Sequence, residues 1–174
     1  LLASYRLTPP RMPSVGPAAP AAFARRLPTT ADVGSGWYDV QQVNPASMPV
    51  TPEARSQGES AAARSVVSQE HRDGPMTWVP DVLVSEDLRA FDTAAHANAY
   101  LTSWRQNEES DALADRVFDG VSVTSGPTST GAQAAFVVGT EAFTLRSTST
   151  SGTMTAAAFD VLIQAAIMRA EPTA

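Results

Sequence analysis

The run of prolines between Arg6 and Phe23 most constrains how this 174-residue chain can fold. Five of the chain's thirteen prolines fall within it, at positions 9, 10, 13, 17 and 20. Each proline fixes its φ angle and removes a backbone donor, so the run favours an extended or polyproline-like backbone over a helix. It also holds little that could form a core. We therefore predict a Pro/Ala-rich arm over residues 1–22, followed by one domain over residues 23–174.

The arm is expected to lie on another protein rather than to hang as a slack tether. A proline-rich segment is already extended and stiff, so it docks with little loss of conformational entropy. The predicted docking contacts are the apolar and proline side chains of this segment: Tyr5, Leu7, Pro9, Pro10, Met12, Pro13 and Val15.

Composition excludes several classes of function. The formal charge of -6 and the pI near 4.8 argue against a nucleic-acid surface, which needs clustered positive charge. The basic residues are all arginine, and without a lysine a Walker-type nucleotide site is excluded. The absence of cysteine excludes disulfides, thiolate metal sites and cysteine nucleophiles.

The sequence places no segment of its own across a membrane. It contains no run of about 18 apolar residues, the length that a membrane-spanning helix requires. Residues 1–4 have two interpretations: the trailing end of a preceding membrane helix or signal segment, or ordinary tail residues. In the first case, a segment preceding Leu1 would hold the domain close to a membrane.

The first part of the domain predicts one strand and one helix. The segment 37–43 alternates after a glycine-marked turn and is typical of a strand. Thr51 and Pro52 form a helix start, with threonine at the cap and proline at the first helical position. The alanine-rich stretch that follows predicts that this helix continues past Gly58 to about Gln69.

The middle of the domain changes character. Residues 76–91 predict one or two strands, with Pro80 at an edge or a break because it cannot donate to a ladder. Asp92 is a plausible N-cap for the helix that follows. One face of that helix carries apolar side chains at helical spacing: Ala97, Tyr100, Leu101 and Trp104.

The last third predicts three strands and a closing helix. Residues 117–124 are typical of one strand, and residues 133–150 of two strands joined near Gly139 and Thr140. Strands that follow one another without intervening helices favour an α+β domain, in which an antiparallel sheet is packed by two or three helices. The final helix carries an amphipathic stripe: Phe159, Leu162, Ile163, Ala166 and Ala170.

Catalytic and metal-binding patterns are missing from the sequence. His71 is interpreted as a solvated residue at a helix end, and His96 as a packing or exposed residue. The acidic stretch 107–116 lacks the register of a calcium loop, and no serine lies in a G-x-S-x-G motif. We therefore predict a protein that is not an enzyme and has no metal or cofactor. A hydrolase would need one of the two histidines as its base.

One candidate ligand site involves aromatic and aliphatic side chains of the last two helices. If the sheet is curved, a small apolar or lipidic ligand could lie between it and the helices. The expected lining is Tyr100, Trp104, Phe159 and Ile163. The alternative is that these four side chains simply fill the core.

Three stretches carry a resemblance to known proteins. Residues 134–170 combine two strands around a glycine-centred turn, a Thr/Ser-rich stretch and an alanine-rich helix, and residues 26–40 and 88–104 are similar in kind. This pattern resembles small secreted or lipid-anchored cell-envelope proteins of actinobacteria, which include lipoproteins and extracellular sensor-like domains of membrane kinases. The chain departs from them in having neither an acylated cysteine nor disulfides. The resemblance implies an extracytoplasmic, membrane-associated location in the cell envelope and brings no catalytic residues.

Two functions are therefore expected. The first is a non-enzymatic accessory subunit that docks on the subunits of a membrane protein complex through its arm and its domain surface. The second is an envelope protein that binds a small apolar ligand or lipid.

Overall fold

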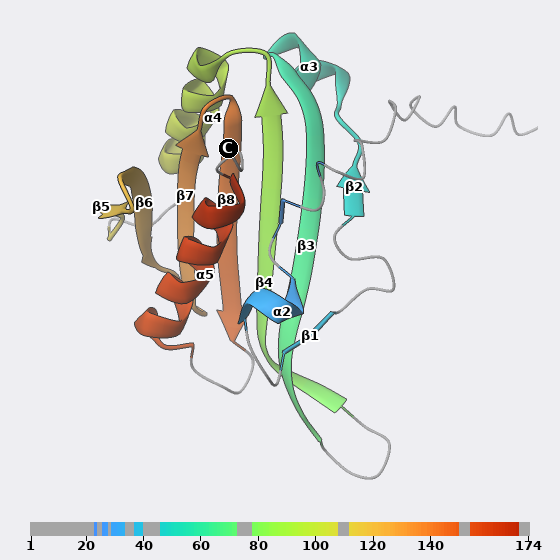
Figure 1. The fold of residues 1–174 in the computed structure, drawn as a ribbon, viewed down its shortest axis with the longest axis vertical. Helices are drawn as coiled ribbons and strands as arrows, with labels where there is room; N and C mark the ends of the chain where they lie inside the picture. The colour runs from blue at the N-terminus through green and yellow to red at the C-terminus, as the bar shows by residue number, and fades with distance from the viewer. Residues whose placement is uncertain are drawn as a thin grey trace, which may run out of the picture.

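The computed structural model describes residues 23, 26–27, 29–33, 37–39, 46–72, 78–107, 112–149 and 154–170. Within these ranges an antiparallel sheet of eight strands has the order β1-β3-β4-β8-β7-β6-β5, and β2 pairs with the same β3 strand as β1 (Figure 1). The strands are β1 (Trp37–Asp39), β2 (Ala46–Met48), β3 (Glu59–Arg72), β4 (Trp78–Phe91), β5 (Ala114–Phe118), β6 (Val121–Pro127), β7 (Ala132–Val138) and β8 (Glu141–Ser149). The helices are α2 (Thr30–Val33), α3 (Pro52–Ser56), α4 (Ala94–Asn107) and α5 (Ala156–Ala170). The predicted α+β class is confirmed.

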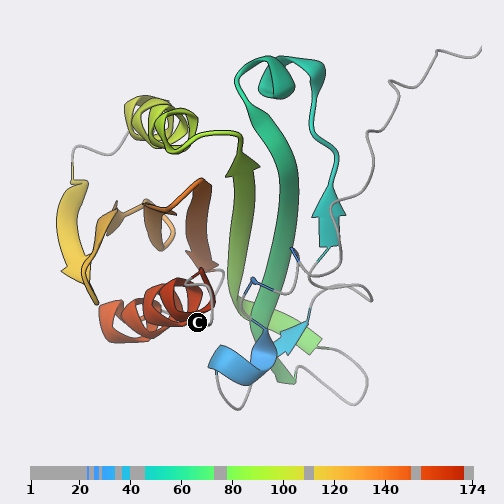
Figure 2. The same cartoon turned by 45° about the horizontal axis from the view of Figure 1, so that its top comes forward.

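Helices α4 and α5 cover opposite faces of the sheet, as Figure 2 shows. Neighbouring residues of β5 make this visible, because successive side chains of a strand point to opposite faces. Asp115 pairs with Arg105 of α4, whereas Arg116 pairs with Asp160 of α5. Successive side chains of β5 thus face α4 and α5 in turn.

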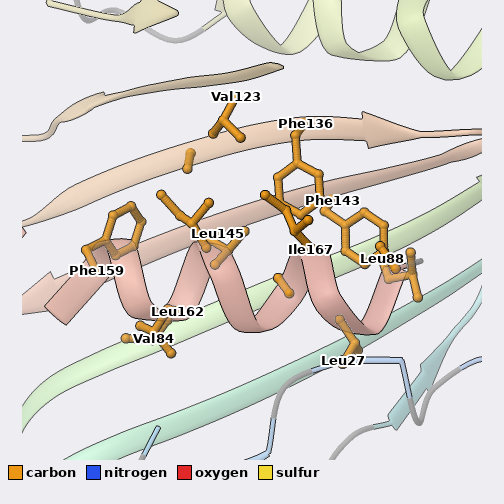
Figure 3. Packing of buried hydrophobic residues seen from close by; sticks show 14 of the residues in the cluster. Leu27, Val84, Leu88, Val123, Phe136, Phe143, Leu145, Phe159, Leu162 and Ile167 are labelled. Carbon is orange, nitrogen blue, oxygen red and sulfur yellow. The ribbon is translucent and has the colours of Figure 1, made fainter. Parts of the chain in front are cut away.

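The main core lies between α5 and the sheet (Figure 3). The rings of Phe136 and Phe143 stack at its centre, with centroids 4.8 Å apart and planes 7° from parallel. Leu27, from the segment before α2, is fully buried in the same cluster. The predicted stripe of α5 is confirmed, since each of its residues is buried: Phe159, Leu162, Ile163, Ala166 and Ala170.

A smaller cluster lies on the α4 face. Phe91, Ala97 and Ala142 are buried there, and Tyr100 packs on Phe91 with ring centroids 5.5 Å apart. The predicted apolar face of α4 is confirmed, because its least exposed positions are the predicted ones: Ala97 is buried, and Tyr100, Leu101 and Trp104 are partly buried. The cap lies one residue later than expected: Thr93 Oγ1, and not Asp92, accepts a hydrogen bond from the His96 amide at 3.2 Å.

The predicted helix from Thr51 to about Gln69 is wrong beyond its first five residues. Thr51 does cap α3, since its Oγ1 accepts from the Ala54 amide at 3.2 Å, but the helix ends at Ser56. Gly58 then has a φ of +86°, which ends the helix and allows the chain to turn into β3. The alanines of β3 lie in the sheet, where burial between neighbouring strands overrides their helix propensity.

The single strand predicted over 117–124 is also wrong, because two strands meet there. Asp119 and Gly120 have φ angles of 47° and 83°, as a two-residue type I′ hairpin turn requires, and they join β5 to β6. The turn expected at Gly139 and Thr140 is confirmed between β7 and β8. Pro80 lies opposite Glu70 at a register shift of the β3–β4 ladder, which agrees with its predicted place at a break.

Candidate binding cleft

A polar cleft lies on the α4 face of the sheet, between the second half of α4 and the strands β3, β4, β7 and β8. It encloses a cavity of about 220 Å³. Nine residues form its wall: Arg64, Ser85, Asp87, Tyr100, Trp104, Gln133, Thr144, Leu145 and Arg146.

Strand register explains why these distant residues meet. Asp87 of β4 pairs with Arg64 of β3 on one side and Thr144 of β8 on the other, which makes a first cross-strand row. A second row follows two residues along, where Arg146 of β8 lies between Ser85 of β4 and Gln133 of β7. Because side chains alternate between faces, both rows point to the face that α4 covers only in part.

The first row contains a formed ion pair. Arg64 donates from Nε to Asp87 Oδ1 at 2.5 Å and from Nη2 to Oδ2 at 2.8 Å, a bidentate arrangement. The hydrogen bond with Asp87 is the main reason why the pKa of Arg64 is raised. The pair fixes both side chains and leaves the row without net charge.

Arg146 gives the cleft its charge. Its side chain is exposed, and within the described ranges no carboxylate pairs with its guanidinium. With Arg64 and Asp87 neutralising each other, the cleft carries one uncompensated positive charge in a chain whose formal net charge is -6. Such a local reversal of sign attracts anions to the cleft.

Gln133 is the unusual member of the wall. Its side chain is 1% exposed, yet its Oε1 has no hydrogen-bond partner in the described part of the protein. Buried polar atoms are nearly always paired, because an unmade hydrogen bond in the interior costs about 1–3 kcal/mol. A ligand that brings a hydrogen-bond donor to this amide oxygen would therefore bind favourably.

The aromatic wall comes from α4. Tyr100 is held between the Phe91 ring and the Arg89 guanidinium, which lies 5.4 Å from the tyrosine centroid. Arg89 is in turn fixed by Glu59, whose two carboxylate oxygens accept from Nη1 at 2.9 and 3.0 Å. Burial is the main cause that raises the pKa of Tyr100, so its hydroxyl stays protonated at neutral pH. Trp104, one turn further along, completes the wall.

The four residues predicted to line one apolar pocket are not brought together. Tyr100 and Trp104 line the polar cleft, whereas Phe159 and Ile163 belong to α5 and pack on the opposite face of the sheet. Ile163 is fully buried in the main core. Phe159 contributes to a second cavity of about 370 Å³ at the beginning of α5, whose mainly apolar wall also includes Pro127, Met154 and Ala156. Gln133 belongs to the walls of both cavities.

The remaining predicted residues fall elsewhere. The docking residues of the arm (Tyr5, Leu7, Pro9, Pro10, Met12, Pro13 and Val15) lie outside the described residues. The placement of His71 at a helix end is wrong, because it pairs with Val79 in the β3–β4 ladder. His96 is exposed on α4, and its Nδ1 lies 2.5 Å from Asp92 Oδ1, a contact that lowers the pKa of Asp92.

Two further properties concern the described residues only. They contain no group of three or more histidine, aspartate or glutamate side chains arranged to hold a metal ion. None of their helices is long and apolar enough to cross a lipid bilayer.

Comparison with known proteins identifies the fold. No protein-family model matches the chain, and no curated protein matches it in sequence. Among solved structures, the extracellular domain of PknH from Mycobacterium tuberculosis matches with a TM-score of 0.53 and 13% sequence identity, over 89% of this chain and 98% of that domain. At this identity the match shows a shared fold. The resemblance to sensor-like domains of membrane kinases is thus supported at the level of the fold.

Proposed function

We propose that this chain is a non-enzymatic, extracytoplasmic accessory subunit that docks on a membrane protein complex through its N-terminal arm and its domain surface. The likeness to a kinase ectodomain supports an extracytoplasmic, non-catalytic role, since that likeness extends over nearly the whole of the ectodomain. The proline-rich composition of residues 1–22 supports the docking role of the arm.

The observation that carries the proposal is how residues close behind the arm are fixed to the domain. Arg26 forms an ion pair with Glu141 and donates to the backbone carbonyls of Arg169 and Ala170 at the end of α5. Arg169 donates in return to the Leu27 carbonyl at 3.2 Å. Because residues close behind the arm are fixed to the end of α5, a partner that binds the arm would also keep the domain close to it.

A pull-down from native membranes tests the proposal. The full chain is expected to bring down a stoichiometric membrane complex, and a chain lacking residues 1–22 is not. A second variant keeps the length of the arm but replaces three apolar side chains, Tyr5, Leu7 and Met12, with serine; it should lose the complex as well. Recovery of the full chain alone and monomeric would overturn the proposal.

The second cavity favours one further candidate function, the binding of a small apolar ligand or lipid. Its volume of about 370 Å³ is within the usual range for small-molecule pockets, and its wall is mainly apolar. Solvent extraction of the purified protein followed by mass spectrometry should release such a ligand. An Ala156→Trp variant, whose larger side chain fills the cavity at the beginning of α5, should release none.

A further inference from the structure

We propose that the cleft beside α4 binds a small hydroxylated acid of the sugar-acid class. This goes beyond the docking role, because it concerns a different surface and a small molecule. Three features of the cleft define the ligand: an unpaired cation, an unpaired buried acceptor and an aromatic wall.

The acidic group of the ligand is selected by Arg146. Within the described ranges its guanidinium has no carboxylate partner, and its neighbour Arg64 is already paired with Asp87 through two hydrogen bonds. A planar guanidinium binds a carboxylate through two parallel hydrogen bonds, which makes a carboxylate a better match than a neutral group.

The hydroxyl groups of the ligand are selected by Gln133. Its Oε1 can only accept, and it has no hydrogen-bond partner in the described part of the protein, although Gln133 lines the cavity. Gln133 lies directly opposite Arg146 in the β7–β8 ladder, so one ligand can reach both side chains. The carboxylate and a donor group must therefore be close to each other on the ligand, as they are on a sugar acid.

The ring of the ligand is selected by Trp104, with Tyr100 beside it in the wall. The faces of the Tyr100 ring already contact Phe91 and Arg89, so the flat apolar surface comes from Trp104. An indole offers such a surface and one hydrogen-bond donor, which suits a ring that has C–H faces and a polar rim. The cavity of about 220 Å³ is smaller than the roughly 300–1,000 Å³ of pockets for drug-sized ligands, so it has room for one ring.

Titration of the full chain with D-glucuronate, with backbone amide chemical shifts as the readout, tests the proposal. We expect saturable shifts at β7, β8 and the second half of α4. D-Glucose, which lacks the carboxylate, should bind at least tenfold more weakly, and so should acetate, which lacks the ring and hydroxyls. Equal shifts with acetate would show an anion site only and would overturn the sugar-acid assignment.

Three variants separate binding from folding. Arg146→Gln should weaken glucuronate binding at least tenfold, whereas Arg55→Gln, which removes the same charge from an exposed position on α3, should not. Gln133→Leu should also weaken binding at least tenfold while raising the melting temperature by about 2–4 °C, because it removes an unpaired buried oxygen. Wild-type affinity in Arg146→Gln and Gln133→Leu, or the absence of saturable shifts in the wild type, would overturn the proposal.

Discussion

Arg26 donates a hydrogen bond to the backbone carbonyl of Arg169, and Arg169 donates one to the carbonyl of Leu27, the residue after Arg26. Nε of Arg26 lies 3.5 Å from the Arg169 carbonyl, and Nη1 of Arg169 lies 3.2 Å from the carbonyl of Leu27. The last carbonyls of a helix have no partner within the helix and carry a partial negative charge, so a cation satisfies them well. This reciprocal contact ties the end of α5 to the beginning of the domain.

Replacing Arg26 with glutamine should destabilise the protein by about 1–3 kcal/mol, because it strips buried carbonyls and the Glu141 carboxylate of their partner. Burial raises the pKa of Glu141, and the charge of Arg26 lowers it. A carboxyl whose pKa is raised in the folded state contributes stability at low pH and loses it as pH rises through that value. The loss caused by Arg26→Gln should therefore be larger at pH 7 than at pH 4 in urea unfolding.

A Glu141→Gln background provides the control, because it removes the titrating group. In that background the effect of Arg26→Gln should be the same at both pH values. If the pH dependence persists without the carboxyl, Glu141 is not its source.

Gly58 and Gly120 form a matched pair for testing backbone strain. Both have φ near +85°, but a Cβ on Gly58 would collide with His96 Nδ1 and Asp92 Oδ1, whereas a Cβ on Gly120 would meet nothing within 4 Å. Each alanine variant should lose about 1–2 kcal/mol through its φ angle. Gly58→Ala should lose at most about 1 kcal/mol more, because the ends of two exposed side chains must move away and give up their contact with each other. A further loss of several kcal/mol by chemical denaturation would contradict this account.

The stacked rings at the centre of the main core predict a large effect of truncation. Phe136→Ala removes a side chain that is fully buried and stacked on Phe143, so it should destabilise the protein by about 3–5 kcal/mol. Val117→Ala, at an apolar position that is 73% exposed, should change stability by no more than about 0.5 kcal/mol. Thermal unfolding of the two variants distinguishes a core position from a surface one.

The edge strand β5 should loosen in acid. Asp115 accepts from Thr124 Oγ1 at 2.7 Å and from Arg105 at 3.1 Å, and these hydrogen bonds lower its pKa. A carboxyl with a lowered pKa contributes stability above its unfolded value and loses it as pH falls through the folded one. Amide exchange in β5, relative to β8, should therefore increase as pH falls below about 4. Asp115→Asn should show the faster exchange already at pH 7, and an unchanged rate would refute the role of the carboxylate.

The fold class and the second half of the chain could be predicted because local patterns there agree with the tertiary structure. The α5 stripe faces the core, and the turn at Gly139 falls between two alternating strands. The errors arose where local and tertiary preferences differ. The Ala-rich start of β3 favours a helix by propensity, and only burial in the sheet makes it a strand. The hairpin at Asp119 and Gly120 had a readable signal, since Asp-Gly between apolar segments is typical of a two-residue turn.

The cleft was only half predictable. Tyr100 and Trp104 were identified by their spacing on a helix, but their partners come from four strands distant in sequence. Gln133 and Arg146 become neighbours through the β7–β8 register, which no local pattern specifies. Pairing Tyr100 and Trp104 with Phe159 and Ile163 failed because spacing shows which residues share a helix face and not which side of a sheet that helix covers.

The sheet that separates α4 from α5 places the two cavities on opposite faces. They nevertheless share Gln133, a residue of β7 that borders both. If a ligand on one face shifts this part of β7, its binding free energy becomes linked to that of a ligand on the other face. Such linkage is reciprocal: each ligand would alter the affinity for the other by the same factor.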